Sequence, residues 1–479
     1  MDEFFISLGI IVIILLLIII IRTLNFKPKK PVEIDEEEIL YDKDEAVSNL
    51  QELVRFKTIS YKNPELEDEK EFKGFINKLK KLFPNVYKVC EFTEFKDRAI
   101  LIKWNGKTNK NPAVMMSHYD VVPVNEEAWT VAPFDGIIKD GALYGRGVVD
   151  TKVTLSASLT ACENLIKSGF VPERDVYFAF SGNEEINGKG AINIVKHFKE
   201  IGIEPEIILD EGGAVVENVF PGVNSACGLI GIAEKGMVDV EYQCKSNGGH
   251  ASAPKPHTPV GILSKACISV ENKPFKTHIT KPVKEMYDTL GRNSTFIYKM
   301  IFANLWCFKW VLDLLCNKNG GEINALMRTT VAFTQMEGSV ASNVIPPKAK
   351  MVSNIRINPN DNVDFVLDSL KKKINNENVQ ITKIQGINPS RISRTDVLGY
   401  KMLEKAVAST WKGCLVSPYL MVQCSDSRHY GEISDRVYRF SAMDLTSEER
   451  AGIHGNDEHV RLSSIIKSVE FYIRLLKQC

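Results

Sequence analysis

The sequence lacks closely spaced cysteines and any excess of charge. Its ten cysteines are scattered without a Cys-x-x-Cys pair, which argues against a zinc ribbon or a dithiol redox motif. Lysine plus arginine equals aspartate plus glutamate, at 60 each, so we expect no nucleic-acid partner. No repeat of solenoid period is visible. What remains is ordinary globular composition, and a chain of 479 residues predicts two domains with appended segments.

One long hydrophobic run lies at the amino terminus. Phe4 to Ile21 carries no charged residue, and as a helix it would measure about 27 Å, close to the ~30 Å hydrocarbon core of a bilayer. A cleaved signal peptide is the alternative, but Asp2 and Glu3 stand where a positive segment belongs and no small-x-small cleavage site follows. We predict an uncleaved single-pass membrane helix over residues 1–24, followed by a linker over residues 25–44.

Two features of the sequence give opposite indications of which side of the membrane the rest of the chain faces. The positive-inside rule favours the cytoplasm, because four cations follow the run: Arg22, Lys27, Lys29 and Lys30. A glycosylation sequon at residues 293–295 points to the other side, but such triplets are frequent by chance.

From about residue 45, short apolar runs alternate with helical patterns. Residues 113–116, 176–180 and 207–209 are predicted strands, and residues 154–166 a helix between the first two. This order is typical of an α/β fold with a mostly parallel sheet flanked by helices. We expect one domain in two parts, residues 45–235 and 358–479.

A change of pattern predicts a second, inserted domain over residues 236–357. Residues 238–243 alternate as a half-exposed strand, a helix follows from about Val260, and residues 329–335 and 349–357 are further predicted strands. The helices predicted at residues 363–374 and 462–476 belong to the resumed α/β pattern. The aromatic stretch 296–316 contains Lys299, Lys309 and Asp313, which favours a buried or interface helix over a second span.

A histidine and several carboxylates follow the predicted strands. His118 closes the first, Glu184 and Glu185 follow the second, and Asp210 follows the third. Open α/β sheets bind ligands beyond the carboxyl ends of their strands, so these side chains are expected to converge. Adjacent carboxylates at a buried strand end are unfavourable unless cations or protons neutralise them.

Two further carboxylates, Asp150 and Asp120, have possible roles at such a site. Asp150 follows the glycine-containing segment 145–149, where it would either cap a helix or bridge two cations. Asp120 lies two residues after His118, where it would accept the second ring N–H of a metal-bound imidazole. Histidine with carboxylates suits zinc, and two ions would activate a water and stabilise an oxyanion. A carboxylate outside the ligand set, such as Glu184, would then carry the proton.

These segments, taken together, resemble the aminoacylase and carboxypeptidase S family of dizinc hydrolases, with features of its N-fatty-acyl-amino-acid hydrolase branch. The resemblance runs from about residue 45 to the carboxyl end, in blocks that include His118-Tyr-Asp-Val-Val-Pro, Leu143-Tyr-Gly-Arg-Gly-Val-Val-Asp-Thr-Lys, Ser181-Gly-Asn-Glu-Glu, Leu209-Asp-Glu-Gly-Gly, Gly248-Gly-His-Ala-Ser-Ala-Pro, Asn343-Val-Ile-Pro, Ser425-Asp-Ser-Arg-His-Tyr and Ile453-His-Gly-Asn-Asp-Glu. It implies an α/β zinc-exopeptidase fold with an inserted lid or dimerisation domain, and a lumenal or extracellular location.

The resemblance also implies roles for individual residues. Asp150 would bridge two zinc ions, one held with Glu185 and His454 and the other with His118 and Asp210. Glu184 would be the general base and Asp120 the residue behind His118.

From the inserted domain, His250 would reach the substrate carbonyl, across a homodimer where relatives dimerise. Arg356 would hold the free carboxylate of the substrate by a bidentate contact, and Asn343 would contribute to substrate binding.

The expected activity is hydrolysis of the amide bond of an N-acyl amino acid or small peptide with a free carboxylate. Co²⁺ or Mn²⁺ would also suit such ligands. The chain departs from the family at Gly182-Asn183, Thr151 and Asn354, none of which is an expected ligand or base. The alternative function is a membrane-anchored, non-catalytic binding or scaffold protein that retains the fold.

Overall fold

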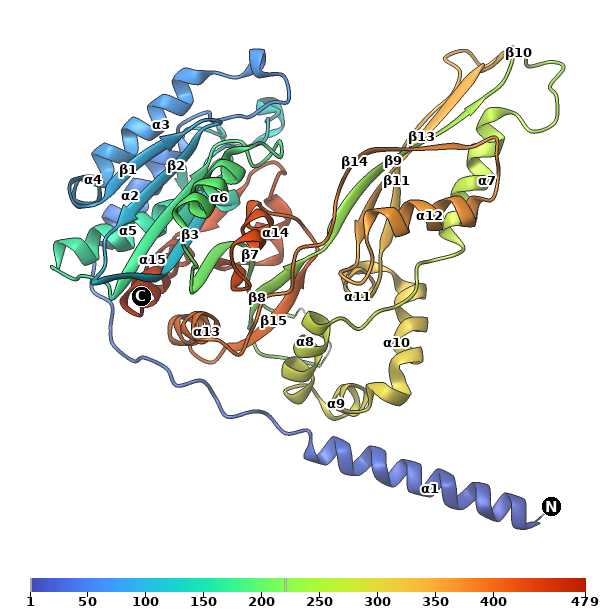
Figure 1. Ribbon diagram of the computed structural model, residues 1–479, viewed down its shortest axis with the longest axis horizontal. Helices are drawn as coiled ribbons and strands as arrows, with labels where there is room; N and C mark the ends of the chain where they lie inside the picture. Colours follow the sequence, from blue (N-terminus) through green and yellow to red (C-terminus); the bar gives the residue numbers. More distant parts are fainter. Residues whose placement is uncertain (1, 219, 221) are drawn as a thin grey trace.

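The computed structural model describes residues 2–218, 220 and 222–479. Its main domain is built on one eight-stranded sheet, shown on the left in Figure 1, with the order β1-β2-β6-β3-β7-β16-β8-β15. In chain order the strands are β1 (Glu91–Phe95), β2 (Ala99–Trp104), β3 (Thr108–His118), β6 (Arg174–Ser181), β7 (Ile207–Val216), β8 (Cys227–Glu234), β15 (Leu415–Met421) and β16 (Val437–Asp444). The central strands β6, β3, β7 and β16 are parallel, while β1 and β2 extend one edge antiparallel.

Helices cover both faces of this sheet because its strands are apolar on both sides. Met115 joins the core under one layer of helices, whereas its neighbours Val114 and Met116 join the core on the opposite face. The first layer contains α2 (Lys43–Val54), α5 (Val153–Lys167), α13 (Leu398–Thr410) and α15 (Leu462–Lys477), and the second contains α6 (Gly190–Ile201). Sheets buried on both faces are typical of parallel α/β folds. The predicted fold class is confirmed.

A second sheet of four strands forms the core of the inserted domain, which we call the lid domain, seen at upper right in Figure 1. Its order is β11-β13-β9-β14, with bounds β9 (Gly236–Lys245), β11 (Thr330–Glu337), β13 (Lys348–Ile357) and β14 (Gln380–Ile387). Helices α7 (Pro259–Glu271) and α12 (Val363–Ile374) share its core. At its tip, β10 (Gly249–His250) pairs with β12 (Val344–Ile345).

The expected boundaries of the inserted domain need two corrections. The helix at 363–374 packs in the lid core rather than in the main domain, because β14 returns to pair with β9 and carries the helix with it. Conversely, part of the expected lid packs with β8 and β15 of the main domain. This part contains α8 (Lys281–Arg292), α9 (Phe296–Ala303), α10 (Leu305–Asn319) and α11 (Gly321–Met327).

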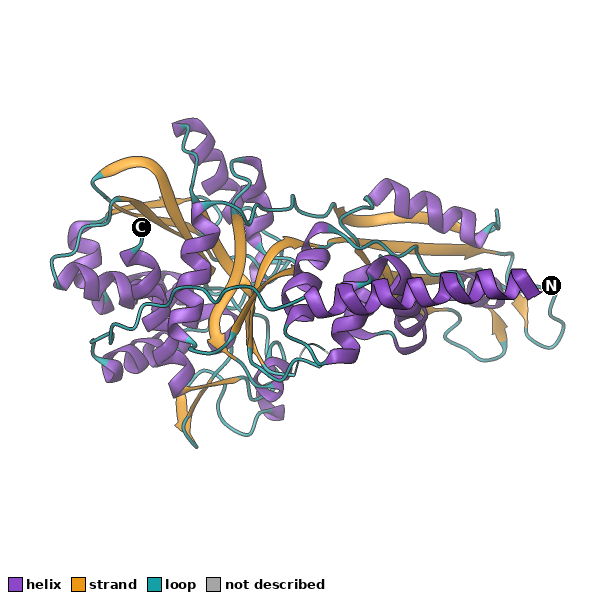
Figure 2. Ribbon diagram, turned by 90° about the horizontal axis from the view of Figure 1, so that it is seen from below, coloured by secondary structure: helices purple, strands orange, loops and turns teal. Residues whose placement is uncertain are grey.

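The amino-terminal helix α1 (Asp2–Asn25) lies outside both sheets and contacts α9 near its carboxyl end (Figures 1 and 2). Among the described residues it is the one unbroken helix long and apolar enough to cross a membrane. The expected linker follows α1 and lies across the main domain, held where Arg474 donates to the backbone oxygens of Asp35 and Glu37 at 3.1 and 2.6 Å. This segment is therefore bound to the surface.

Candidate metal centre

The candidate site lies at the carboxyl ends of neighbouring parallel strands. His118 is the last residue of β3, and Glu184 and Glu185 follow β6. Asp150 lies in the one-turn helix η3 (Val148–Lys152), and His454 follows the short helix α14 (Ser447–Gly452). Segments far apart in the sequence thus meet at one edge of the sheet, as expected for this architecture.

Two histidines converge on Asp150 from opposite sides. His118 Nε2 is 3.0 Å from Asp150 Oδ1, and His454 Nε2 is 2.9 Å from Asp150 Oδ2. His454 Nε2 is also 3.2 Å from Glu185 Oε2. One carboxylate with an imidazole at each oxygen is compatible with bridging two cations.

Glu211, and not the predicted Asp210, faces this cluster. Glu211 Oε1 lies 3.4 Å from His118 Nε2, whereas the Asp210 carboxylate accepts the backbone N–H of Ser427 at 2.9 Å. Neighbouring residues of a strand point to opposite faces, and β7 has a bulge here, since Asp210 pairs with Arg439 of β16 and the next paired residue is Gly213. The bulge turns Glu211 into the site. In the structure Glu211, and not Asp210, is therefore grouped with His118 as a possible metal ligand.

The donor set fits divalent cations. Two groups of side chains bring one ligand atom each to within 4.8 Å of one another: His118, Asp150 and Glu185, and His118, Glu184 and Glu211. Imidazole nitrogen with carboxylate oxygen is a ligand set that zinc accepts. We conclude that the arrangement can hold a metal at this position.

The electrostatics of the cluster also favour the binding of cations. Burial raises the pKa of both Glu184 and Glu211 well above the usual range of a carboxyl. Burial opposes protonation of His118, but the carboxylates of Glu211, Asp120 and Asp150 raise its pKa well above normal. Hydrogen bonds from the histidines lower the pKa of Asp150 despite its burial. Crowded buried carboxylates are stabilised by positive charge, which cations would supply.

Asp120 supports both the histidine and the glutamate pair. Its backbone oxygen is 3.0 Å from His118 Nδ1, which turns Nε2 towards Asp150. Its carboxylate accepts the backbone N–H groups of Glu184 and Glu185 at 3.0 and 3.1 Å, and the Ser60 hydroxyl at 2.7 Å. The carboxylate itself is 3.5 Å from Nδ1, so its main contacts hold the turn after β6.

Glu458 is a buried residue of the site that sequence reasoning missed. Its carboxylate accepts the backbone N–H groups of Gly147 and Val149 at 3.0 and 2.8 Å, and pairs with Arg146 at 2.7 Å. It therefore holds the loop that presents Asp150. The sequence contained one indication of this role, because Glu458 lies in the same block as His454 and had no role assigned to it.

The structure does not bring His250 and Asn343 to this cluster. Both are exposed at the tip of the lid, where the Asn343 carbonyl accepts the N–H of Ala251 at 2.9 Å and His250 Nδ1 lies 2.8 Å from Ser252 Oγ. Figure 1 shows β10, which carries His250, at the end of the lid remote from β3 and β7. Within one chain neither residue reaches Asp150.

Arg356 lies between the two domains. It is half-buried on β13, its Nε donates to Asn354 Oδ1 at 3.2 Å, and its Nη1 is 3.7 Å from Cys424 Sγ. Cys424 immediately precedes the segment whose Ser427 binds Asp210. Arg356 thus faces the loop next to the cluster without contacting a cluster residue.

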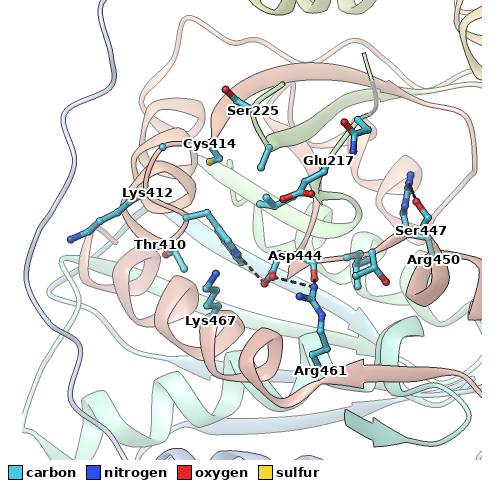
Figure 3. Close-up of a pocket in the computed structure, with 17 residues that line it drawn as sticks. Glu217, Ser225, Thr410, Lys412, Cys414, Asp444, Ser447, Arg450, Arg461 and Lys467 are labelled. Carbon is cyan, nitrogen blue, oxygen red and sulfur yellow. Dashed lines mark hydrogen bonds and ion pairs between the residues drawn. The ribbon is translucent and has the colours of Figure 1, made fainter. Parts of the chain in front are cut away.

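A separate polar cavity of about 580 Å³ lies beside Asp444 and contains none of the cluster residues. Asp444 accepts hydrogen bonds from Arg461 and from Trp411 Nε1 on its wall. Figure 3 shows Lys467 and Arg450 on opposite sides of this cavity. Its cations do not converge on one point, so we place the chemistry at the cluster.

The comparisons with known proteins agree with this geometry. The model of Peptidase family M20/M25/M40 matches residues 114–478. The chain is 33% identical to a probable carboxypeptidase S-like protein of Dictyostelium discoideum, over 90% of this chain and 85% of that one. It is 32% identical to an N-fatty-acyl-amino acid synthase/hydrolase of Xenopus tropicalis, over 91% and 86% of the two chains.

Solved structures show the same fold. An M20 family metallo-carboxypeptidase from Sulfolobus solfataricus superposes with a TM-score of 0.66 at 19% identity, covering 91% of this chain and 99% of that one. Human carnosine dipeptidase 1 gives 0.63 at 15% identity, covering 91% and 96%. The family match and these relatives identify the chain as an enzyme of the peptidase or amidohydrolase type. The chain belongs to the M20/M25/M40 peptidase family, as the resemblance predicted.

Proposed function

We propose that the protein is a dizinc hydrolase that cleaves the amide bond of N-acyl amino acids or small peptides with a free carboxylate. The observation that carries this proposal is the Asp150 carboxylate between His118 and His454, with Glu184 beside His118 and Glu211. One ion would be held by Asp150, Glu185 and His454, and the other by Asp150, His118 and Glu211. When bound, zinc polarises a carbonyl and makes a water molecule more acidic.

Glu184 is the proposed general base. It takes a proton from water and delivers it to the leaving nitrogen, a transfer that suits a carboxyl whose pKa is raised by burial. The Asp120 carboxylate positions Glu184 by accepting the backbone N–H of Glu184. Glu458 positions Asp150 through the preceding loop. The chain retains every one of these carboxylates, which favours catalysis over a scaffold function.

Arg356 and the lid supply the proposed substrate contacts. The Arg356 guanidinium would bind the free carboxylate in the bidentate manner of arginine. His250 and Asn343 are exposed on the lid tip and would act on the site of a second copy, which makes a homodimer the proposed active form. Long-chain acyl groups are favoured by the names of the relatives and by the hydrophobic helix α1.

We also propose that α1 anchors the protein in a membrane as a single span. Phe4 to Ile18 lie exposed along the helix, although they are almost all large and apolar. Lipid would cover this surface.

The proposal is tested with detergent-solubilised full-length chain and a panel of N-acyl amino acids and dipeptides. We expect hydrolysis that a chelator abolishes and added zinc restores, and that Glu184→Gln lowers by at least ~100-fold while two metals stay bound. The exposed Glu127→Gln is the matched control and should keep wild-type activity. If the zinc-loaded protein cleaves no member of the panel, the substrate class is wrong; if it binds no metal, the scaffold function replaces catalysis.

A further inference from the structure

The helices α9 and α10 expose a continuous apolar surface that the main domain leaves uncovered. Trp306, Trp310 and Leu314 are 55%, 69% and 62% exposed, and their spacing of four residues places them in one stripe along α10. On α9, Phe296 and Ile297 are also exposed. The opposite side of the pair is packed, since Phe302, Leu312 and Cys316 are buried in the main-domain core. Exposed aromatic and aliphatic patches of this kind mark interaction surfaces.

This surface lies at the carboxyl end of α1. The fully buried Asn304, at the corner between α9 and α10, donates to the Ile19 carbonyl at 3.3 Å and to the Thr23 hydroxyl at 3.2 Å. Arg22 of α1 donates back to Asn304 Oδ1 at 3.2 Å and to the Ala303 carbonyl at 3.1 Å. The segment Ile19 to Thr23 near the end of α1 is therefore joined to the corner, and Figure 1 shows α9 and α10 on the side of the molecule where α1 leaves it.

The segment after α1 carries positive charge to the same place. Lys29 pairs with Asp288 of α8 at 2.7 Å, and Arg292 donates to the Lys27 carbonyl at 2.9 Å. A cavity of about 480 Å³ opens between α1, α8 and α10, with Arg22, Lys284, Arg292 and Asp288 on its walls beside Trp306. Cations and tryptophan at the end of an apolar span are typical of the boundary between headgroups and acyl chains.

We infer that α9 and α10 form a second membrane contact, in which the exposed stripe enters the headgroup region of the bilayer that α1 spans. The proposed occupant is phospholipid of that bilayer, with apolar side chains in the acyl boundary and cations at the phosphates. This inference rests on the proposed anchor. The pair does not act as a second span, because α10 carries Lys309 and Asp313, the latter paired with Arg328 at the end of α11, and its other side belongs to the main-domain core. The enzyme body is thereby held on the membrane surface.

Tryptophan fluorescence tests this inference directly. Trp104, Trp129 and Trp411 are buried, at 2%, 8% and 5% exposure, so the two exposed tryptophans of the chain are both on α10. Full-length protein is reconstituted into phosphatidylcholine vesicles whose acyl chains carry bromine, a contact quencher. We expect a partial loss of emission relative to unbrominated vesicles, and no loss in the double variant Trp306→Phe and Trp310→Phe.

Equal wild-type emission in brominated and unbrominated vesicles would overturn the inference. If those tryptophans also resist acrylamide, a second copy of the chain covers the stripe instead. A carbonate wash separates the two proposals. If the protein stays in the vesicles but is not quenched, only the α9–α10 contact is contradicted. If the wash releases the protein, the membrane anchor is contradicted, and the inference that rests on it is contradicted as well.

A charged variant provides a second measurement. Leu314→Glu should reduce quenching several-fold, because a carboxylate is expelled from the acyl boundary. The control Ile268→Glu, at an exposed apolar position of α7 on the lid, should leave it unchanged. Hydrolysis of a soluble short-chain substrate should be unaltered in both variants, which shows that they are folded; equal quenching in both would contradict the inference.

Discussion

The carboxylate of Asp120 accepts a hydrogen bond from the backbone N–H of Glu184 at 3.0 Å. Through this bond a residue outside the metal cluster determines where the proposed base lies. Because the same carboxylate also accepts the N–H of Glu185, its loss disturbs a proposed ligand and the base together.

Asp120→Asn replaces one of these acceptors by a donor. We expect a roughly 10- to 100-fold loss of zinc affinity or kcat, the range found for residues that orient metal ligands. Zinc titration and kinetics at saturating zinc separate the two effects. A variant with wild-type affinity and kcat would show that the turn after β6 holds its shape without this contact.

Replacement of Glu211 and Asp210 distinguishes the two neighbouring carboxylates. Glu211→Gln should lose one of two bound metals, because Glu211 faces His118. Asp210→Asn should keep both metals, since its carboxylate binds the Ser427 N–H instead, and only the melting temperature should fall. Metal analysis after gel filtration gives the stoichiometry. Loss of a metal in Asp210→Asn alone would restore Asp210 as the ligand.

Arg356→Lys should weaken the binding of substrates with a free carboxylate. Loss of a charged bidentate contact removes about 1.5–3 kcal/mol, which corresponds to a roughly 10- to 100-fold rise in KM with kcat unchanged. The methyl ester of the same substrate serves as the comparison and should be affected little. Equal effects on acid and ester would mean that Arg356 stabilises the junction of the domains instead.

Mixing two inactive variants tests whether the lid acts on a second copy. Glu184→Gln and His250→Ala should each be inactive alone. In a random mixture half of the dimers contain both chains, and each of these has one intact site, so roughly a quarter of wild-type activity should return. Activity that stays at the level of the single variants would mean that His250 serves the site of its own chain after a lid movement.

Glu449, which lies outside the cluster, makes the stability of the fold depend on pH. Glu449 is buried, accepts a hydrogen bond from the N–H of Thr446 and pairs with Arg461 at 3.1 Å. Burial raises the pKa of its carboxyl, but these contacts outweigh burial and lower the pKa below its ordinary value. A carboxyl with a lowered folded-state pKa stabilises the fold above its unfolded pKa, and the effect disappears as the pH falls through the folded value.

Glu449→Gln should therefore lower the melting temperature at neutral pH, and the difference from wild type should shrink under acid conditions. Differential scanning calorimetry at both pH values measures this, with the exposed neighbour Glu448→Gln as control. A difference that is the same at both pH values would assign the effect to packing rather than to charge.

Much of the fold was predictable because its elements have strong local patterns. The helices expected at 154–166 and 462–476 and the strands before His118 and Glu184 all exist, with bounds shifted by a few residues. Their apolar runs are buried by the sheet or by its helices whatever the details of packing. Most of the cluster was predictable too, since strand ends of a parallel sheet converge.

Residue type and order alone were sufficient to predict the α/β class and the family resemblance, and through that resemblance the meeting of His118, Asp150, Glu184, Glu185 and His454. The tertiary structure decided which of Asp210 and Glu211 faces the site, since only the pairing of β7 with β16 creates the bulge. It also assigned the helix at 363–374 to the lid through β14, and left the stripe on α10 exposed. These outcomes depend on contacts between segments far apart in the chain, which no local pattern contains.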